Sequence, residues 1–192
     1  LNNALVDIET VNLDLGAGGA GGDWLRYNST VGISVDLGAG TGTSQFGGLL
    51  ALTGVENVVG TLLADRITGN SGANRIGDGL FDTGADTIFG GGGNDVIFLT
   101  NQSAGARIDG GTGTDTLWLT PDAPAIIVSP GVFLPGTAVL DLRHPSNNTG
   151  AFAGVTVSGI EVFIGNHTLP IQSIFEFRGD AGSQRVTGMD EI

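Results

Sequence analysis

Two aspartates occupy the same position in two copies of a nine-residue motif. Residues 90–98 read GGGGNDVIF and residues 110–118 read GGTGTDTLW, and both fit the template G-G-x-G-x-D-x-U-x, where U is a large aliphatic residue. Glycine permits tight turns whose carbonyl oxygens can point at a cation, and Asp95 and Asp115 each add a charged oxygen. Ca²⁺ takes about six to eight oxygen ligands of these kinds. The motif therefore predicts a turn that binds a cation, followed by a short strand.

The nonapeptide resembles the calcium-binding repeat of the repeats-in-toxin (RTX) family, also called the hemolysin-type repeat. Neighbouring segments keep its phase, because an acidic or amide residue repeatedly stands two positions before an aliphatic residue. These pairs are Asp65 with Ile67, Asn74 with Ile76, Asp86 with Ile88, Asp95 with Ile97, and Asp115 with Leu117. Ala106 takes the acidic position before Ile108, so that copy is expected to bind poorly or not at all.

Short aliphatic clusters separated by Gly, Asn, Thr and Ser predict many short strands and little helix. With the resemblance, they predict an all-β fold, a right-handed parallel β-roll or β-solenoid with Gly-rich calcium-binding turns. Three segments are expected. They are amino-terminal strand coils over 1–59, the nonapeptide β-roll over 60–120, and carboxy-terminal strand coils with a degenerate repeat over 121–192. The aliphatic residues of the repeats are expected in the core.

A second repeat lies outside the nonapeptides. Residues 33–60 can be laid on 138–165 without a gap. The identities cluster at Asp-Leu, where 36–37 meet 141–142, and at Gly-U-Glu, where 54–56 meet 159–161. This clustering indicates common descent or a shared local geometry.

In a parallel roll, two turns and two strands make one coil, so every second turn lies on the same side. This places Asp65 with Asp86, and Asn74 with Asp95 and Asp115. The best site is expected between Asp95 and Asp115, a second between Asp65 and Asp86, and a weaker third between Asn74 and Asp95. The resemblance implies that carbonyl ligands come from Gly90, Gly92, Gly93, Gly110, Thr112 and Gly113. Asp109 and Asp78 precede a turn, and they either add a ligand or are simply solvated.

The chain is acidic and has no cysteine. Its 192 residues carry a net charge of −13, and all seven basic residues are arginine. Such a charge disfavours nucleic acids and anionic membranes and favours cations. Without disulfides, calcium is the expected staple of a secreted chain. The start at Leu1 suggests a processed chain or a fragment, and no secretory signal or membrane-spanning run is found.

The resemblance implies a calcium-binding structural or surface-interaction module of a secreted bacterial protein, exported by a type I system. Such a module would bind copies of itself or cell-surface material, as a surface layer, a filament or an adhesin. The alternative is a module attached to a secreted protease, lipase or alginate epimerase. No catalytic constellation is found, so the chain itself is not expected to be an enzyme. Phe89, Phe98 and Trp118 are expected to point outward, where they pack against another segment, contact a protein or a sugar, or have no particular role.

Overall fold

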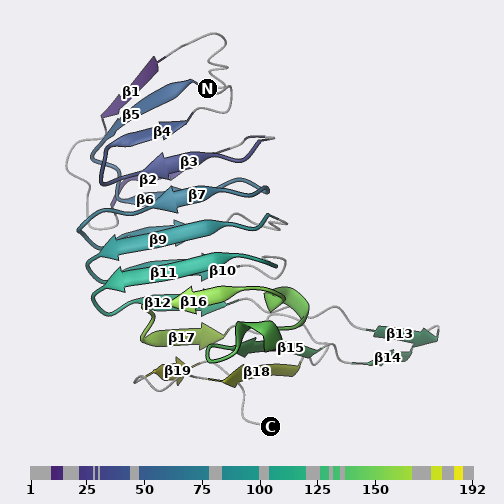
Figure 1. The fold of residues 1–192 in the computed structure, drawn as a ribbon. Coiled ribbons are helices and arrows are strands. Elements are labelled where there is room, and N and C mark those ends of the chain that lie inside the picture. The colour runs from purple at the N-terminus through teal and green to yellow at the C-terminus, as the bar shows by residue number, and fades with distance from the viewer. Residues whose placement is uncertain are drawn as a thin grey trace.

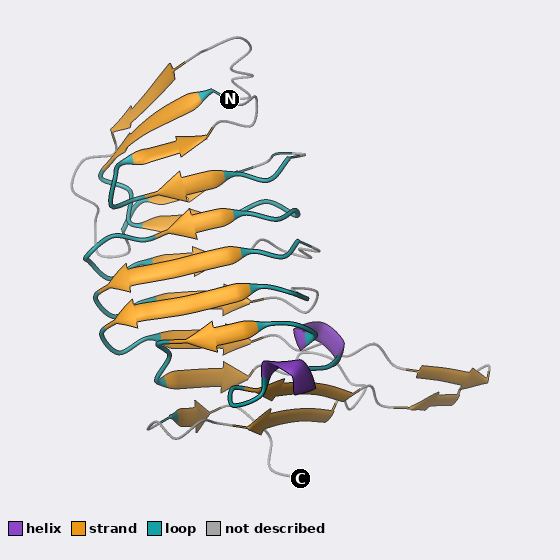
Figure 2. Ribbon diagram, in the orientation of Figure 1, coloured by secondary structure: helices purple, strands orange, loops and turns teal. Residues whose placement is uncertain are grey.

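Nearly all the regular structure in this computed structural model is β-strand. The structure describes residues 10–14, 22–27, 29, 31–43, 48–77, 84–99, 104–119, 126–129, 132–134, 137–165, 174–178 and 184–187. Two large sheets contain most of the strands, and they run the length of an elongated stack (Figure 1). Among the described residues, helix is limited to two short 3-10 segments, η1 (Pro145–Asn147) and η2 (Gly150–Phe152) (Figure 2).

The first large sheet has eight strands in the order β1-β5-β4-β3-β7-β9-β11-β16 and is called here the mixed sheet. Its strands are β1 (Thr10–Asp14), β3 (Ser34–Asp36), β4 (Thr41–Thr43), β5 (Leu49–Thr53), β7 (Arg66–Thr68), β9 (Thr87–Gly92), β11 (Arg107–Thr112) and β16 (Thr156–Ser158).

The second large sheet has seven strands in the order β19-β17-β12-β10-β8-β6-β2, all of them parallel, and is called here the parallel sheet. Its strands are β2 (Trp24–Arg26), β6 (Asn57–Val59), β8 (Arg75–Gly77), β10 (Val96–Leu99), β12 (Thr116–Leu119), β17 (Val162–Gly165) and β19 (Arg185–Thr187).

Two smaller pairs of strands lie outside the large sheets. They are the antiparallel hairpin of β13 (Ile126–Ser129) with β14 (Val132–Leu134), and the parallel pair of β15 (Thr137–Asp141) with β18 (Ile174–Arg178). Both large sheets contain strands from all three segments expected from the sequence. No described helix is long and apolar enough to cross a membrane.

The prediction of a parallel β-roll or β-solenoid is wrong, although the fold is mostly β. The larger sheet is mixed, because β4 runs antiparallel to both β3 and β5. Local turn chemistry explains the reversal. The Asp36 carboxylate accepts the Ala39 N–H at 2.8 Å, and Gly40 takes a left-handed φ of 66°. This tight turn returns the chain to the same sheet.

From β5 to β12 the chain alternates between the mixed and the parallel sheet, so each strand can send one aliphatic side chain between them. Ile67, Ile88 and Ile108 are register partners in the mixed sheet. Ile76, Ile97 and Leu117 are partners in the parallel sheet. All six are at most 1% exposed, which confirms the core assignment. Burying an Ile or Leu side chain contributes about 1.5–3 kcal/mol, so these rows hold the sheets together.

The two copies of the second repeat share turn geometry but not strand pairing. Gly54 and Gly159 both have a left-handed φ, 69° and 60°. The glutamates that follow them lead into β6 and β17 of the parallel sheet. The strands at the start of the two copies diverge, since β3 belongs to the mixed sheet whereas β15 pairs with β18. The repeat therefore encodes the Gly-U-Glu turn.

Candidate cation site at the stacked turns

The turns that lead from the mixed sheet into the parallel sheet lie beside one another along one edge. The strands that flank them are in register, with Gly91 opposite Gly111 in one sheet and Val96 opposite Thr116 in the other. The acidic or amide residue that ends each turn therefore stands next to its counterpart. The residues aligned in this way are called the turn column, and they are Glu56, Asn74, Asp95, Asp115 and Glu161.

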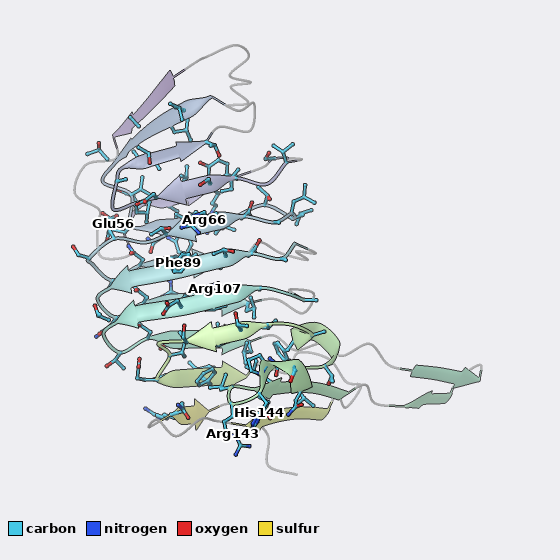
Figure 3. The ribbon with its side chains drawn as sticks, in the orientation of Figure 1. Glu56, Arg66, Phe89, Arg107, Arg143 and His144 are labelled. Atoms are coloured by element: carbon cyan, nitrogen blue, oxygen red, sulfur yellow. The ribbon has the colours of Figure 1, made fainter. Side chains whose placement is uncertain are left out.

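Hydrogen bonds link neighbouring members of the turn column. Oδ1 of Asp95 accepts the N–H of Asn74 at 2.8 Å, and Oδ1 of Asp115 accepts the N–H of Asp95 at 2.8 Å. Oε2 of Glu161 then accepts the N–H of Asp115 at 2.8 Å. Glu56, at the edge of the stack in Figure 3, likewise accepts the Asp23 N–H at 2.7 Å. One carboxylate oxygen of each acid thus completes the backbone of the preceding turn.

The second oxygen of Asp95 and of Asp115 has no such role. The two residues are 1% and 0% exposed, and Oδ2 of each is buried without a hydrogen-bond donor among the described residues. A charged, buried carboxylate oxygen without a hydrogen-bond donor destabilises the folded state by on the order of several kcal/mol. Two such oxygens in neighbouring turns therefore make this pair of turns a candidate site for a cation.

Backbone carbonyl oxygens lie close to these two carboxylate oxygens. A Cβ atom built on Gly90 would collide with both Oδ2 of Asp95 and the carbonyl oxygen of Gly110. A Cβ on Gly110 would collide with the Gly159 carbonyl oxygen and lie 2.7 Å from Oδ2 of Asp115. Only glycine permits this approach. Each unpaired carboxylate oxygen therefore has a carbonyl oxygen from the next turn beside it.

The remaining nonapeptide positions line the same two turns. Gly92 pairs with Thr112 in the register of β9 and β11. A Cβ on Gly113 would collide with the carbonyl oxygen of Gly93, so this carbonyl points toward the neighbouring turn. The side chain of Asn94 links its own turn to the next one, because it accepts the Thr114 N–H at 2.9 Å. The structure therefore brings together the eight residues expected at the best site.

Burial raises the pKa of both aspartates. Desolvation, reinforced by the charge of Asp115 and opposed by the hydrogen bond from Asn74, raises the pKa of Asp95 to about 6. Desolvation also raises the pKa of Asp115, against the hydrogen bond from Asp95, and the charges of Glu161 and Asp109 add to the rise. Without a cation, the ionised form of both groups is disfavoured.

Asp65 and Asp86, expected to form a second site, lie on the opposite edge, and Oδ1 of Asp86 accepts the Asp65 N–H at 2.7 Å. The Asp65 carboxylate already has protein donors on both oxygens. Oδ1 accepts the Ile33 N–H at 2.8 Å and Oδ2 accepts the Thr61 N–H at 2.6 Å. In the next turns Ala106 and Val155 occupy the acidic position. This edge has fewer oxygens left for a cation than the turn column.

In the weaker third site, expected between Asn74 and Asp95, the Asn74 side chain is also bonded to protein groups. Oδ1 of Asn74 accepts the Asn70 N–H at 2.8 Å, and its Nδ2 donates to the Glu56 carbonyl at 2.8 Å. Asp109 lies on the outer side of β11, half-buried, and acts on Asp115 through its charge. Asp78 lies outside the described residues. No three His, Cys, Asp or Glu side chains in the described ranges cluster as a metal site, so a cation here would depend on carbonyl oxygens.

No protein-family model and no curated protein sequence matches this chain. The geometry of the turns themselves indicates the cation site.

Sequence reasoning missed two groups that lie beside the candidate site, the Glu161 carboxylate and the Gly159 carbonyl. Glu161 lies 46 residues beyond Asp115, after a long insertion, and it does not belong to a nonapeptide. A signal for it was present. The Gly-U-Glu phrase occurs in both copies of the second repeat and leads into a strand of the parallel sheet each time. The acidic residue of that phrase could therefore have been placed in the same column.

Proposed function

We propose that this chain is a calcium-binding structural and surface-interaction module of a secreted bacterial protein. The observation that supports calcium most directly is the pair of buried Oδ2 atoms of Asp95 and Asp115, which lack donors and lie beside carbonyl oxygens of adjacent turns. A mixture of carboxylate and carbonyl oxygens suits Ca²⁺ better than the smaller Mg²⁺.

In this proposal, Asp95 with the Gly110 carbonyl and Asp115 with the Gly159 carbonyl hold the cation. The resemblance adds the carbonyls of Gly90, Gly92, Gly93, Thr112 and Gly113. The bound ion supplies the positive charge that the two desolvated carboxylates lack. The residues themselves link successive turns, because each carboxylate also accepts a backbone N–H from the turn before it.

Calcium binding would make the stability of the stack depend on its surroundings. A ligand at ten times its dissociation constant stabilises the folded state by about 1.4 kcal/mol per site. Extracellular calcium modules have dissociation constants of about 10⁻⁴–10⁻³ M. We therefore propose that the nonapeptide array is fully folded outside the cell and unstable in a calcium-poor cytosol, which agrees with export before folding.

Self-association is the proposed structural role. The described strands at the ends of the two large sheets, β1 and β16 in one and β2 and β19 in the other, have a hydrogen-bonded neighbour on one side only. Strand edges of this kind tend to be covered by another chain or segment. Sedimentation velocity with and without calcium tests this role, and a calcium-dependent larger species is the expected result.

Calorimetric titration with CaCl₂ tests the cation site. Wild type is expected to bind calcium, and Asp115→Asn is expected to bind it at least tenfold more weakly. Asp36→Asn is the matched control, because it removes an equal charge at the β3–β4 turn, where the Asp36 carboxylate accepts the Ala39 N–H and is not a member of the turn column. Equal calcium affinity in all three proteins would contradict the proposed site.

A further inference from the structure

The outer face of the parallel sheet differs in charge from the rest of the chain. The chain has 20 acidic and 7 basic residues. The strands of the parallel sheet nevertheless contain no Asp or Glu, and their only charged residues are Arg26, Arg75 and Arg185. All three arginines are exposed. This face, called here the arginine face, is a basic strip on an acidic protein.

Apolar residues form a row along the arginine face, interrupted at Gly77, which has no side chain. The register places one residue per strand in this row, in the order Val59, Gly77, Phe98, Trp118 and Ile164. The side chains in the row are partly exposed. Neighbouring strands are about 4.8 Å apart, so the row is a narrow track that crosses the strands. The rings of Phe98 and Trp118 lie 5.7 Å apart at 25°, stacked side by side.

Two arginines of this face, Arg26 and Arg75, are held against rings, and none of the three has a carboxylate partner among the described residues. The guanidinium of Arg75 lies 5.2 Å from the centre of the Phe98 ring, and that of Arg26 lies 4.6 Å from the Trp24 ring. The ion pairs of the described residues involve only Asp141, with Arg143 and His144. Stacking orients a guanidinium while leaving the N–H groups at its edge free for a carboxylate. These arginines are therefore arranged to receive an anion.

The outer face of the mixed sheet provides an internal comparison. Arg66 and Arg107 also stack on a ring there, at 4.9 and 5.9 Å from Phe89 (Figure 3). However, Phe89 is flanked in its row by Thr68 and Asp109, so that no second aromatic ring continues the track. The acidic Asp36 and Asp109 also belong to this sheet. Of these two sheet faces, the arginine face is the one whose described residues combine arginines without a described carboxylate partner with an extended apolar row.

We propose that the arginine face binds an extended acidic polysaccharide of the uronic acid type. Sugar rings would pack against the partly exposed edges of the stacked Phe98 and Trp118 rings, and their carboxylates would meet Arg75 and the flanking arginines. The spaced charges and flat apolar faces of such a chain match the spaced arginines and the row of rings. Double-stranded DNA is a poorer match, because its phosphates, about one charge per 1.7 Å of helix axis, would face a protein of net charge −13. This inference rests on the surface-interaction part of the proposed function and does not require the calcium site.

Fluorescence titration tests this inference directly, because both tryptophans of the chain, Trp24 and Trp118, lie in strands of the parallel sheet. The probe is an oligogalacturonate too short to gel, and its methyl-esterified form is the uncharged comparison. Titrations are made at fixed calcium and in chelator. We expect the acid form to change the tryptophan emission and the ester to bind at least tenfold more weakly.

Four variants locate the binding face. Arg75→Gln is expected to weaken binding about tenfold, whereas Arg66→Gln, which removes an equally exposed and ring-stacked charge from the opposite sheet, is expected to change it less than twofold. Trp118→Leu is expected to weaken binding about tenfold, with partial recovery in Trp118→Phe. Far-ultraviolet circular dichroism verifies that each variant is folded.

The inference would be overturned by equal weakening in Arg66→Gln and Arg75→Gln, by equal affinity for acid and ester, or by no binding to wild type. It would also be overturned if Trp118→Leu dissolved an oligomer without affecting the titration, since a second copy would then occupy the face. Calcium binding is measured separately on the same samples, so its failure cannot be mistaken for failure of this inference.

Discussion

The backbone N–H of Asp95 donates to Oδ1 of Asp115 at 2.8 Å, and Oδ2 of the same carboxylate is buried without a described donor. One side chain thus does two things at once. It completes the backbone of the neighbouring turn, and it places an uncompensated oxygen beside a carbonyl of the next turn. A substitution that preserves the first role and removes the second can separate structure from cation binding.

Asp115→Asn is such a substitution, because the amide oxygen can still accept the Asp95 N–H. In chelator, the variant is expected to be as stable as wild type or more stable by on the order of 1 kcal/mol, because a desolvated charge is removed. In saturating calcium it is expected to be less stable than wild type by about 1–2 kcal/mol. Urea denaturation under both conditions measures the unfolding free energy of the variant relative to wild type. A variant that is less stable than wild type by the same amount in chelator and in calcium would disprove the metal role.

Gly90→Ala tests the close approach between turns. The added Cβ would meet the Gly110 carbonyl and the Asp95 carboxylate, so a loss of about 1–3 kcal/mol in unfolding free energy is expected. Gly38→Ala is the matched control, because its nearest neighbour would be Oδ1 of Asp36 at 3.4 Å, an ordinary contact. Thermal melting of both variants measures the difference, and equal melting temperatures would rule out the tight packing described here.

Asp65→Asn separates a structural aspartate from the proposed ligands. The carboxylate of Asp65 accepts the Thr61 N–H at 2.6 Å and the Ile33 N–H at 2.8 Å. An amide can satisfy only one of these donors with its single oxygen, so a loss of about 1–3 kcal/mol is expected. The loss should be the same in calcium and in chelator. A calcium-dependent loss in urea denaturation would instead assign Asp65 to a metal site.

Stability without calcium is expected to fall as the pH rises. The pKa of Asp95 is about 6 in the folded chain, against an ordinary value of 3.8. Below about pH 4 the group is protonated in both states, and its stabilising contribution is complete. Between about pH 4 and 6 the unfolded chain releases its proton first, and the contribution, on the order of 2 kcal/mol, is lost as the pH rises through the folded pKa.

Urea denaturation in chelator from pH 4 to 7 measures this slope. Asp95→Asn removes the titrating group and should make the slope shallower. Calcium should also reduce the loss of unfolding free energy at higher pH, because calcium binding favours the ionised carboxylate. An unchanged slope in Asp95→Asn would show that another group controls the pH dependence.

Much of the local arrangement could be predicted because it depends on short-range periodicity. The two-residue offset between each acid and its aliphatic partner predicted both the buried rows and the edge on which each acid lies. Ile97 and Leu117 are buried register partners, and the acids two positions before them are joined by a hydrogen bond. Phe98 and Trp118 lie on the outer side of the parallel sheet, as expected.

The sequence by itself determined which residues alternate between core, turn and outer face, because the alternation of a strand and the geometry of a glycine turn are local properties. Only the tertiary structure decided that β4 reverses and makes one sheet mixed, that Thr61 and Ile33 occupy the Asp65 carboxylate, and that Glu161 joins the turn column. These features depend on contacts between segments far apart in the chain or on competing donors. A repeat pattern in the sequence predicts neither these long-range contacts nor the competing donors.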